Sequence, residues 1–253
     1  MKKKLLILLF SIIALNSKAQ NWGGGIDQEI FNWGFSFQYI ASEYKIIRAA
    51  NWQEPIPDPN PNGGPASPRL KAMNSPLSPG FGIGFVLNYK LNKNLDLRST
   101  PTIVFYDRIV NYEYDLEGYN SNFASNFPDG KKQQKVSPVM VDLPLSIKLK
   151  SERRKDFRAY ALLGAKYSTD LGGNKKPKDE GAIGIERLLK SKKSYASYEA
   201  GLGFDLYFEY FKMSPEIKVS HSFGNVIRHE GHPYDTPIDK AILRNFTFSL
   251  FFE

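Results

Sequence analysis

Three histidines are the side chains best suited to acid–base or metal chemistry in this sequence, and they lie in two short stretches. Ser220, His221 and Ser222 are adjacent, and His229-Glu230-Gly231-His232 offers possible metal ligands. Successive residues of a strand point to opposite sides, so neither serine can share a face with His221. The second stretch lacks the spacing of the zinc motif HExxH and lies on a predicted loop rather than a helix. We therefore expect no catalytic residue, no metal site and no cofactor.

Other patterns that carry chemistry are also missing. The chain has no cysteine, which excludes a disulfide framework and thiol chemistry. The run GFGIGF at Gly80–Phe85 lies inside a predicted strand rather than at a strand-to-helix turn, so it does not predict a phosphate loop. The formal net charge of +8 falls to about +4 without the four lysines of the first 20 residues. No basic run indicates a nucleic-acid partner.

Charged side chains instead recur at every second position of long apolar segments, most clearly in residues 195–219. One parity there holds Tyr198, Ala200, Leu202, Phe204, Leu206 and Phe208, and the other holds Ser197, Glu199, Gly201, Gly203 and Asp205. After a break around Glu209–Lys212, the apolar residues Met213, Pro215, Ile217 and Val219 oppose Ser214, Glu216, Lys218 and Ser220. This pattern predicts a hairpin of two strands that are charged on one face only.

Strand length distinguishes the two architectures that such alternation allows. In a soluble sandwich the apolar face is a core, whereas in a membrane barrel it faces lipid. The predicted strands run past the roughly 9–11 residues that cross a bilayer at a tilt, and soluble strands are usually about 5–6 residues long. The length therefore favours a barrel with lipid outside and charge inside.

Eight alternating segments follow one another along the chain, at about residues 33–41, 81–90, 95–105, 139–149, 157–166, 195–208, 213–220 and 245–252. Long connections at residues 48–79, 115–135, 169–193 and 228–240 alternate with short ones at 92–94, 151–156 and 209–212. The sequence thus predicts an all-β, eight-stranded antiparallel transmembrane β-barrel with short periplasmic turns and long extracellular loops.

The long connections are predicted to lack strands of their own. Residues 48–79 are rich in Pro, Asn and Gly, a composition that is unable to hold a strand ladder. Residues 115–135 form a second polar loop. The run IERLLK at Ile185–Lys190 could form one helical turn.

The inward parity collects charges of both signs. The predicted inward set is Asp96, Arg98, Asp142, Lys148, Arg158, Lys166, Glu199, Asp205, Glu216 and Lys218. An eight-stranded barrel is just wide enough inside for side chains, and charges in so narrow a lumen must pair or become neutral. We therefore expect an ion-paired, plugged interior rather than a conducting or proton-carrying pore.

The two ends of the chain carry export signals. Lys2–Lys4, the apolar run Leu5–Leu15 and the small-residue site before Gln20 form a secretory signal peptide, predicted to span residues 1–19 and to be cleaved between Ala19 and Gln20. The barrel domain would then span residues 20–253. The last strand, with Phe246, Phe248, Leu250 and Phe252 on one side, is typical of the terminal strand by which the barrel assembly machinery recognises such proteins.

Proline weakens this interpretation at three places. Pro101, Pro144 and Pro215 lie inside predicted strands, and each lacks a backbone donor for the ladder. Register near them is uncertain from the sequence, and a soluble periplasmic barrel like the lipocalins stays open as an alternative.

Four stretches together resemble one family. They are Leu95–Arg98 with Pro101, Asp142–Lys150 (DLPLSIKLK), Tyr198–Lys218 (YEAGLGFDLYFEYFKMSPEIK) and Phe246–Glu253 (FTFSLFFE). They are similar to the PorT (SprT) outer-membrane barrels of the Bacteroidetes type IX secretion system, and a leader that ends in Ala-Gln is typical of that phylum. The resemblance covers nearly the whole barrel but not the loops, and it transfers no catalytic or binding residue.

The resemblance implies an outer-membrane accessory component of type IX protein secretion, and of gliding motility where that occurs. Such a protein works by assembly with other secretion components, and the basic turn Arg153, Arg154 and Lys155 is the candidate periplasmic contact. The alternative is a stand-alone surface barrel that binds a ligand or partner through its extracellular loops. A lipid-modifying enzyme is disfavoured because no Ser/His pair shares an outward face.

Overall fold

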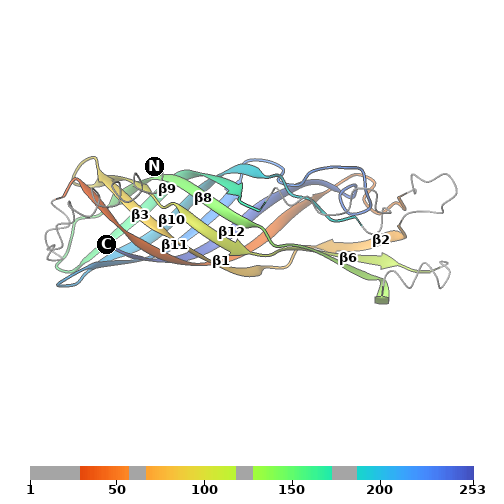
Figure 1. Cartoon of the computed structure of the whole chain (residues 1–253), viewed down its shortest axis with the longest axis horizontal. Coiled ribbons are helices and arrows are strands. Elements are labelled where there is room, and N and C mark those ends of the chain that lie inside the picture. Colours follow the sequence, from red (N-terminus) through yellow and green to blue (C-terminus); the bar gives the residue numbers. More distant parts are fainter. Residues whose placement is uncertain (1–28, 57–66, 118–127, 173–186) are drawn as a thin grey trace, which may run out of the picture.

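The computed structural model describes residues 29–56, 67–117, 128–172 and 187–253, which form an elongated β-barrel extended at one end by a small sheet (Figure 1). The elements are β1 (Phe31–Arg48), β2 (Arg69–Asn74), β3 (Ser78–Lys90), β4 (Leu95–Ser99), β5 (Thr102–Tyr106), β6 (Arg108–Asp115), the 3-10 turn η1 (Pro128–Gly130), β7 (Lys131–Val136), β8 (Val139–Lys150), β9 (Phe157–Asp170), β10 (Ser194–Tyr207), β11 (Lys212–Ser222) and β12 (Ile238–Phe252). Within the described residues, no helix is long and apolar enough to cross a membrane.

The barrel closes because β1 pairs with β12 on one side and with β3 on the other. β4 and β5 are two parts of one barrel strand, since both pair with β3 and with β8. Every other neighbour is sequential and antiparallel, in the order β8, β9, β10, β11 and β12. The prediction of an eight-stranded antiparallel barrel is therefore confirmed.

Side chains alternate as the sequence predicts, with apolar groups exposed on the outer surface and charged groups buried inside. In β10, Leu202 is 67% exposed and Phe204 is 47% exposed, whereas Glu199 and Asp205 are almost completely buried. In water this arrangement would leave the apolar surface without a partner, so it identifies lipid as the surrounding solvent.

Outward aromatic side chains are frequent along the lipid-facing surface. Near the end with the short turns they include Phe31, Trp33, Tyr89, Phe157 and Phe208, and further along the strands they include Phe35, Phe37, Tyr39, Phe81, Phe85, Phe105, Tyr167 and Tyr198. Exposed rings of this kind are suited to contact with lipid. The first barrel strand begins at Phe31, paired with Tyr89, and the last ends at Phe252, paired with Met213. Both residues therefore lie on the side of the short turns, which is periplasmic.

The prolines interrupt hydrogen bonding without shifting the register. Pro144 lies opposite the break between β4 and β5, and the pairings Leu145 with Ser99 and Asp142 with Thr102 keep one register across it. Since Pro101 lies in that break, two missing donors share one gap. The Ser99 hydroxyl donates to the Pro144 carbonyl oxygen at 2.8 Å across the gap.

Pro215 makes a similar gap between β10 and β11. Their pairing stops at Gly203 with Glu216 and resumes at Leu206 with Met213 in the same register. The uncertainty expected near the prolines is therefore resolved as a loss of hydrogen bonds and not a slip of the strands.

The prediction that the long connections lack strands is wrong for two of them. β2, from the Pro-rich connection, pairs with β6, and β6 pairs with β7, giving a three-stranded sheet beyond the extracellular end (Figure 1). Its inner face carries Leu70, Met73 and Tyr112, which are buried against the loop before β12. Burial of these side chains offsets the poor strand propensity of their surroundings.

Other sequence predictions about the connections have mixed outcomes. Residues 187–190 are not helical, so the expected helical turn does not form there, and residues 185–186 lie outside the described part. The last long connection is shorter than predicted, because β12 already begins at Ile238. The signal peptide and its cleavage site between Ala19 and Gln20 also lie outside the described residues.

Leu145→Arg tests the lipid-facing assignment. Leu145 is 56% exposed near the middle of the apolar outer surface of β8. Placing arginine there should lower the free energy of unfolding in lipid vesicles by roughly 2–4 kcal/mol, because the charge must leave water. The matched control is Leu188→Arg, at an exposed leucine of an extracellular loop. Equal losses in both variants would show that Leu145 does not face lipid.

Candidate functional site: the barrel interior

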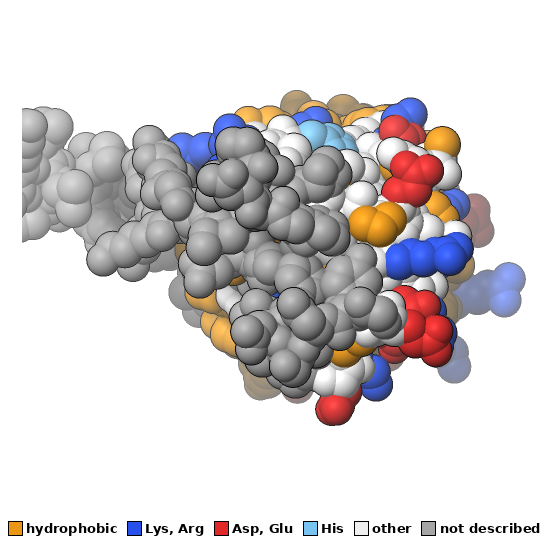
Figure 2. All heavy atoms as spheres, turned by 90° about the vertical axis from the view of Figure 1, so that its right-hand side faces the viewer, with side chains coloured by type: hydrophobic (Ala, Val, Ile, Leu, Met, Phe, Trp, Pro, Cys, Tyr) orange, Lys and Arg blue, Asp and Glu red, His pale blue; other side chains and the backbone are white. Residues whose placement is uncertain are grey.

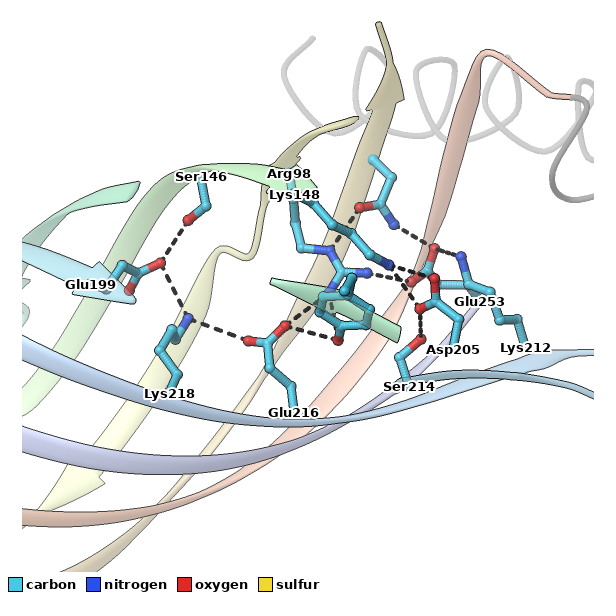
Figure 3. A network of polar contacts seen from close by, with 12 residues as sticks. Arg98, Ser146, Lys148, Glu199, Asp205, Lys212, Ser214, Glu216, Lys218 and Glu253 are labelled. Atoms are coloured by element: carbon cyan, nitrogen blue, oxygen red, sulfur yellow. Dashed lines mark hydrogen bonds and ion pairs between the residues drawn. The ribbon is translucent and has the colours of Figure 1, made fainter. Parts of the chain in front are cut away.

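Arg98 on β4 is the centre of a polar network inside the periplasmic half of the barrel (Figure 3). Its Nη1 donates to Glu216 at 3.0 Å and its Nη2 donates to Glu253 at 3.1 Å. Its Nε donates to the Asn88 side-chain oxygen at 2.7 Å, and Asn88 in turn donates to Glu253. One guanidinium thus ties together β3, β4, β11 and the C-terminal residue.

Two lysines complete this end of the network (Figure 3). Lys148 on β8 places its ammonium 2.8 Å from both carboxylate oxygens of Asp205, which also accepts a hydrogen bond from Ser214 at 2.7 Å. Lys212 donates to Glu253 at 2.7 Å. Each buried charge therefore meets an opposite charge and further hydrogen bonds, as its removal from water requires.

Buried charges pair with opposite charges elsewhere in the lumen as well. Lys218 lies 3.3 Å from Glu199 and 3.9 Å from Glu216, and Ser146 donates to Glu199 at 2.8 Å. Two further pairs join Lys166 to Asp142 at 2.7 Å and Lys150 to Asp96 at 2.6 Å.

All ten residues of the predicted inward set lie on the inner side of the barrel, and nine of them are buried: Asp96, Arg98, Asp142, Lys148, Lys166, Glu199, Asp205, Glu216 and Lys218. Arg158 is half-buried near the periplasmic opening, where it lines a small cavity with Asp205. Sequence reasoning missed Lys150, Lys212 and Glu253. All three share the inward parity of their strands, but the predicted strands were ended one residue short of each.

Tyr160 was also missed as a network residue, and its ring lies across the lumen. Its hydroxyl donates to Glu216 at 3.0 Å, and the ammonium of Lys148 lies 3.8 Å from the ring centroid. A Cβ atom at Gly203 would come within 2.4 Å of this ring. Glycine at that position therefore makes room for the tyrosine that fills the lumen.

The cavities that the described residues leave inside the lumen beside the network are small. Two lumenal cavities, one lined by Asp96, Lys150 and Arg158 and one by Asp142, Lys166 and others, each have a volume of about 10 Å³. Such a space holds about one water molecule.

An apolar cluster covers the extracellular mouth of the barrel, beyond the ion pairs. Tyr112 of β6 donates its hydroxyl to the Tyr234 carbonyl oxygen at 2.6 Å, and their rings meet edge to face at 5.4 Å. Val226, Ile227 and Ile238 are completely buried beside them. The lumen is thus closed by charge pairing on one side and by packed apolar groups on the other. Seen from this end, acidic and basic side chains are interspersed on the described surface (Figure 2).

The histidine stretches do not assemble a catalytic or metal site in the described residues. Ser220 and Ser222 are buried inside the barrel, whereas His221 faces outward and stacks on Tyr198. His232 is buried in the loop before β12, where burial lowers the pKa of its imidazole. No group of three His, Cys, Asp or Glu residues that could hold a metal ion occurs within the part of the chain that the structure describes.

The basic turn between β8 and β9 lies at the periplasmic end. Arg153 is anchored, because its guanidinium lies 3.8 Å from the centroid of the Tyr207 ring and its Nε donates to the Lys155 carbonyl oxygen at 2.6 Å. Arg154 and Lys155 are exposed. The turn therefore presents two cationic side chains on a fixed backbone.

A closed antiparallel barrel with an apolar, aromatic-rich outer surface and a charged interior defines an outer-membrane β-barrel protein. The sequence model of the family described as "Outer membrane protein beta-barrel domain" matches residues 27–228, and the chain belongs to this family. The protein is accordingly one of the outer membrane. None of the curated proteins matches the sequence.

Solved structures include similar barrels. OprG from Pseudomonas aeruginosa is 12% identical with a TM-score of 0.44, and the match covers 88% of this chain and 92% of OprG. Ail, the attachment invasion locus protein of Yersinia pestis, is 13% identical with a TM-score of 0.35, covering 87% of this chain and 96% of Ail. These similarities add nothing to the family assignment.

A double-mutant cycle tests the charge pairing in the lumen. Lys148→Met should lower the free energy of unfolding by about 3–5 kcal/mol, because it leaves the buried Asp205 carboxylate without its closest cation. Adding Asp205→Leu should restore most of this loss, since no uncompensated charge then remains. The measurement is urea unfolding of the barrel in lipid vesicles.

The control for this cycle is the exposed pair of Lys135 and Asp107, whose charged atoms lie 2.8 Å apart in the extracellular region. Hydrogen bonds from Lys135 and Ser137 lower the pKa of the Asp107 carboxyl. Water screens this pair, so Lys135→Met should cost at most about 1 kcal/mol. A coupling energy near zero between Lys148 and Asp205 would contradict the ion-paired lumen.

Proposed function

We propose that this protein is an accessory component of type IX protein secretion that works by assembly with other secretion proteins rather than by transport or catalysis. The observation that supports this best is the filled lumen, in which Arg98, Lys148 and Tyr160 and their partners occupy the path that cargo or solute would need. A barrel without a passage acts through its surfaces. The resemblance of the barrel strands to PorT proteins points to the type IX secretion system as the assembly in which the protein works.

The turn between β8 and β9 is the proposed contact with the periplasmic part of that machine. Arg154 and Lys155 are exposed there, while Arg153 is held by Tyr207 and also lies 3.7 Å from Asp156. Cationic side chains on an ordered turn are suited to an acidic partner surface, because little backbone entropy is lost on binding.

A second candidate function is binding of a surface partner through the extracellular sheet of β2, β6 and β7. This candidate is favoured by the order of that sheet, which has a buried inner face and a polar outer face. On the outer face, Gln133 donates to Asn111 at 2.9 Å. A sheet that is packed in this way is a preformed surface rather than a replaceable connection.

Deletion of the gene separates these candidates. If the secretion proposal holds, cargo with a type IX C-terminal signal should accumulate in the periplasm with that signal uncleaved, as measured by immunoblotting of cell fractions. The deletion strain is then complemented with Arg154→Gln/Lys155→Asn. Asparagine is chosen because Lys155 has a positive φ of 54°, which asparagine tolerates. This double variant should restore export only partly.

The matched control for that variant is Arg69→Gln/Lys131→Gln, which removes two exposed cations from the extracellular sheet. It should restore export fully, and heat-modifiable migration in detergent gels should show that both variants fold. Normal export in the deletion strain would overturn the secretion proposal and leave the surface-binding function.

A further inference from the structure

The outer surface of the barrel carries charge in one place only. Among the outward positions of the described barrel strands, charged side chains occur only on the neighbouring strands β1 and β12. They are Glu43, Lys45, Lys240 and Arg244, with the exposed Asp239 at the bulge next to Lys240. On the next strand, His221 is paired with Arg244. The remaining outward positions are apolar, aromatic or uncharged. A charge placed towards lipid is costly, so its restriction to one patch needs a local reason.

The strand register places this patch at the outer border of the membrane. Paired residues lead from Leu145 on β8 through Ala165, Tyr198, His221 and Arg244 to Glu43 on β1. Strands tilted by 35–45° and spaced about 4.8 Å apart climb by about 3 Å at each step. Five steps raise Glu43 by about 15 Å above Leu145, which is about half the thickness of the hydrocarbon layer.

The side chains of the patch have the order expected at such a border. Phe246, on the membrane side of Arg244, has its ring centroid 5.3 Å from the guanidinium carbon. Beside Arg244, His221 stacks on Tyr198 with ring centroids 5.6 Å apart. Lys45 lies one step further from the membrane and is exposed. Aromatic rings thus lie at the level of the acyl chains and cations at the level of the headgroups.

The patch keeps unbalanced positive charge. Arg244 donates from Nε to Glu43 at 2.7 Å and also from Nη2 to the same carboxylate, so the acid is already compensated. The Arg244 side chain is still 36% exposed. Lys45 forms no ion pair within the described residues. A second copy of the barrel would bring the same excess of positive charge to this surface, which disfavours self-association there.

We propose that Lys45 and Arg244 bind a phosphate group of an outer-leaflet glycolipid. The phosphate lies between the ammonium and the guanidinium, while the acyl chains of the same lipid lie along Phe246 and Tyr198. Arginine and lysine together recognise phosphate by charge and by hydrogen bonds. The site is independent of the secretion proposal, because it needs only the barrel and its place in the outer membrane.

Titration with two lipids tests this site. Purified barrel in nonionic detergent is titrated with phosphorylated lipid A and with the same lipid A after removal of its phosphates, and native mass spectrometry counts the bound lipid. The wild-type barrel should bind the phosphorylated form at least tenfold more tightly. Lys45→Gln should weaken that binding by roughly fivefold, the effect of one cation at a membrane surface. Lys45→Gln/Arg244→Gln should abolish the preference.

Lys131→Gln on β7 is the matched control, since it removes an exposed extracellular cation far from the patch and should leave the affinity unchanged. Because Arg244 is tied to Glu43, its loss could disturb folding, and the Lys45 variant alone then decides. Equal affinity for the two lipids would overturn the proposal. So would an equal effect of Lys131→Gln, competition by inorganic phosphate at the concentration of the lipid, or a change in dimerisation without a change in lipid binding.

Discussion

Most charged side chains inside this barrel bind an opposite charge, because the lumen is narrow and lipid surrounds the wall. The buried Arg108 guanidinium instead donates to the hydroxyls of Tyr106 and Tyr195. Closure of the hydrogen-bond ladder between β1, β3 and β12 makes the lumen narrow, since it leaves no strand edge and little space for water. Arg98 is compensated by Glu216 and Glu253, and Lys148 is compensated by Asp205. Charges in the lumen therefore need partners, and the paired side chains fill the lumen.

This constraint connects the interior to the way the protein works. A lumen filled by side chains leaves the two ends and the outer surface as the parts available for contact. The extracellular end is built into a sheet over an apolar cluster that contains Tyr112 and Tyr234. The periplasmic end presents a short basic turn. On the outer surface, the charge around Arg244 lies where the acyl chains give way to headgroups, so each surface is matched to its surroundings.

Alternation along a strand is a local property, which is why the eight barrel strands and their inward charges could be predicted from the sequence. Two features depend on contacts between distant residues and could not be predicted. The partner of each charge depends on the register, as in Arg98 with Glu216. The strand β2 forms because Leu70 and Met73 are buried against other connections, although its surroundings are rich in proline.

Electrical recording across a planar bilayer tests the central claim, that the lumen is closed by paired charges, most directly. Purified barrel, inserted at a known number of copies per bilayer, should produce no stable current at moderate voltage. The network around Arg98 and the apolar cluster at the extracellular mouth would both have to open for ions to pass. Stable, porin-sized current steps in the wild-type protein would contradict this account and would require a wider barrel than the one described.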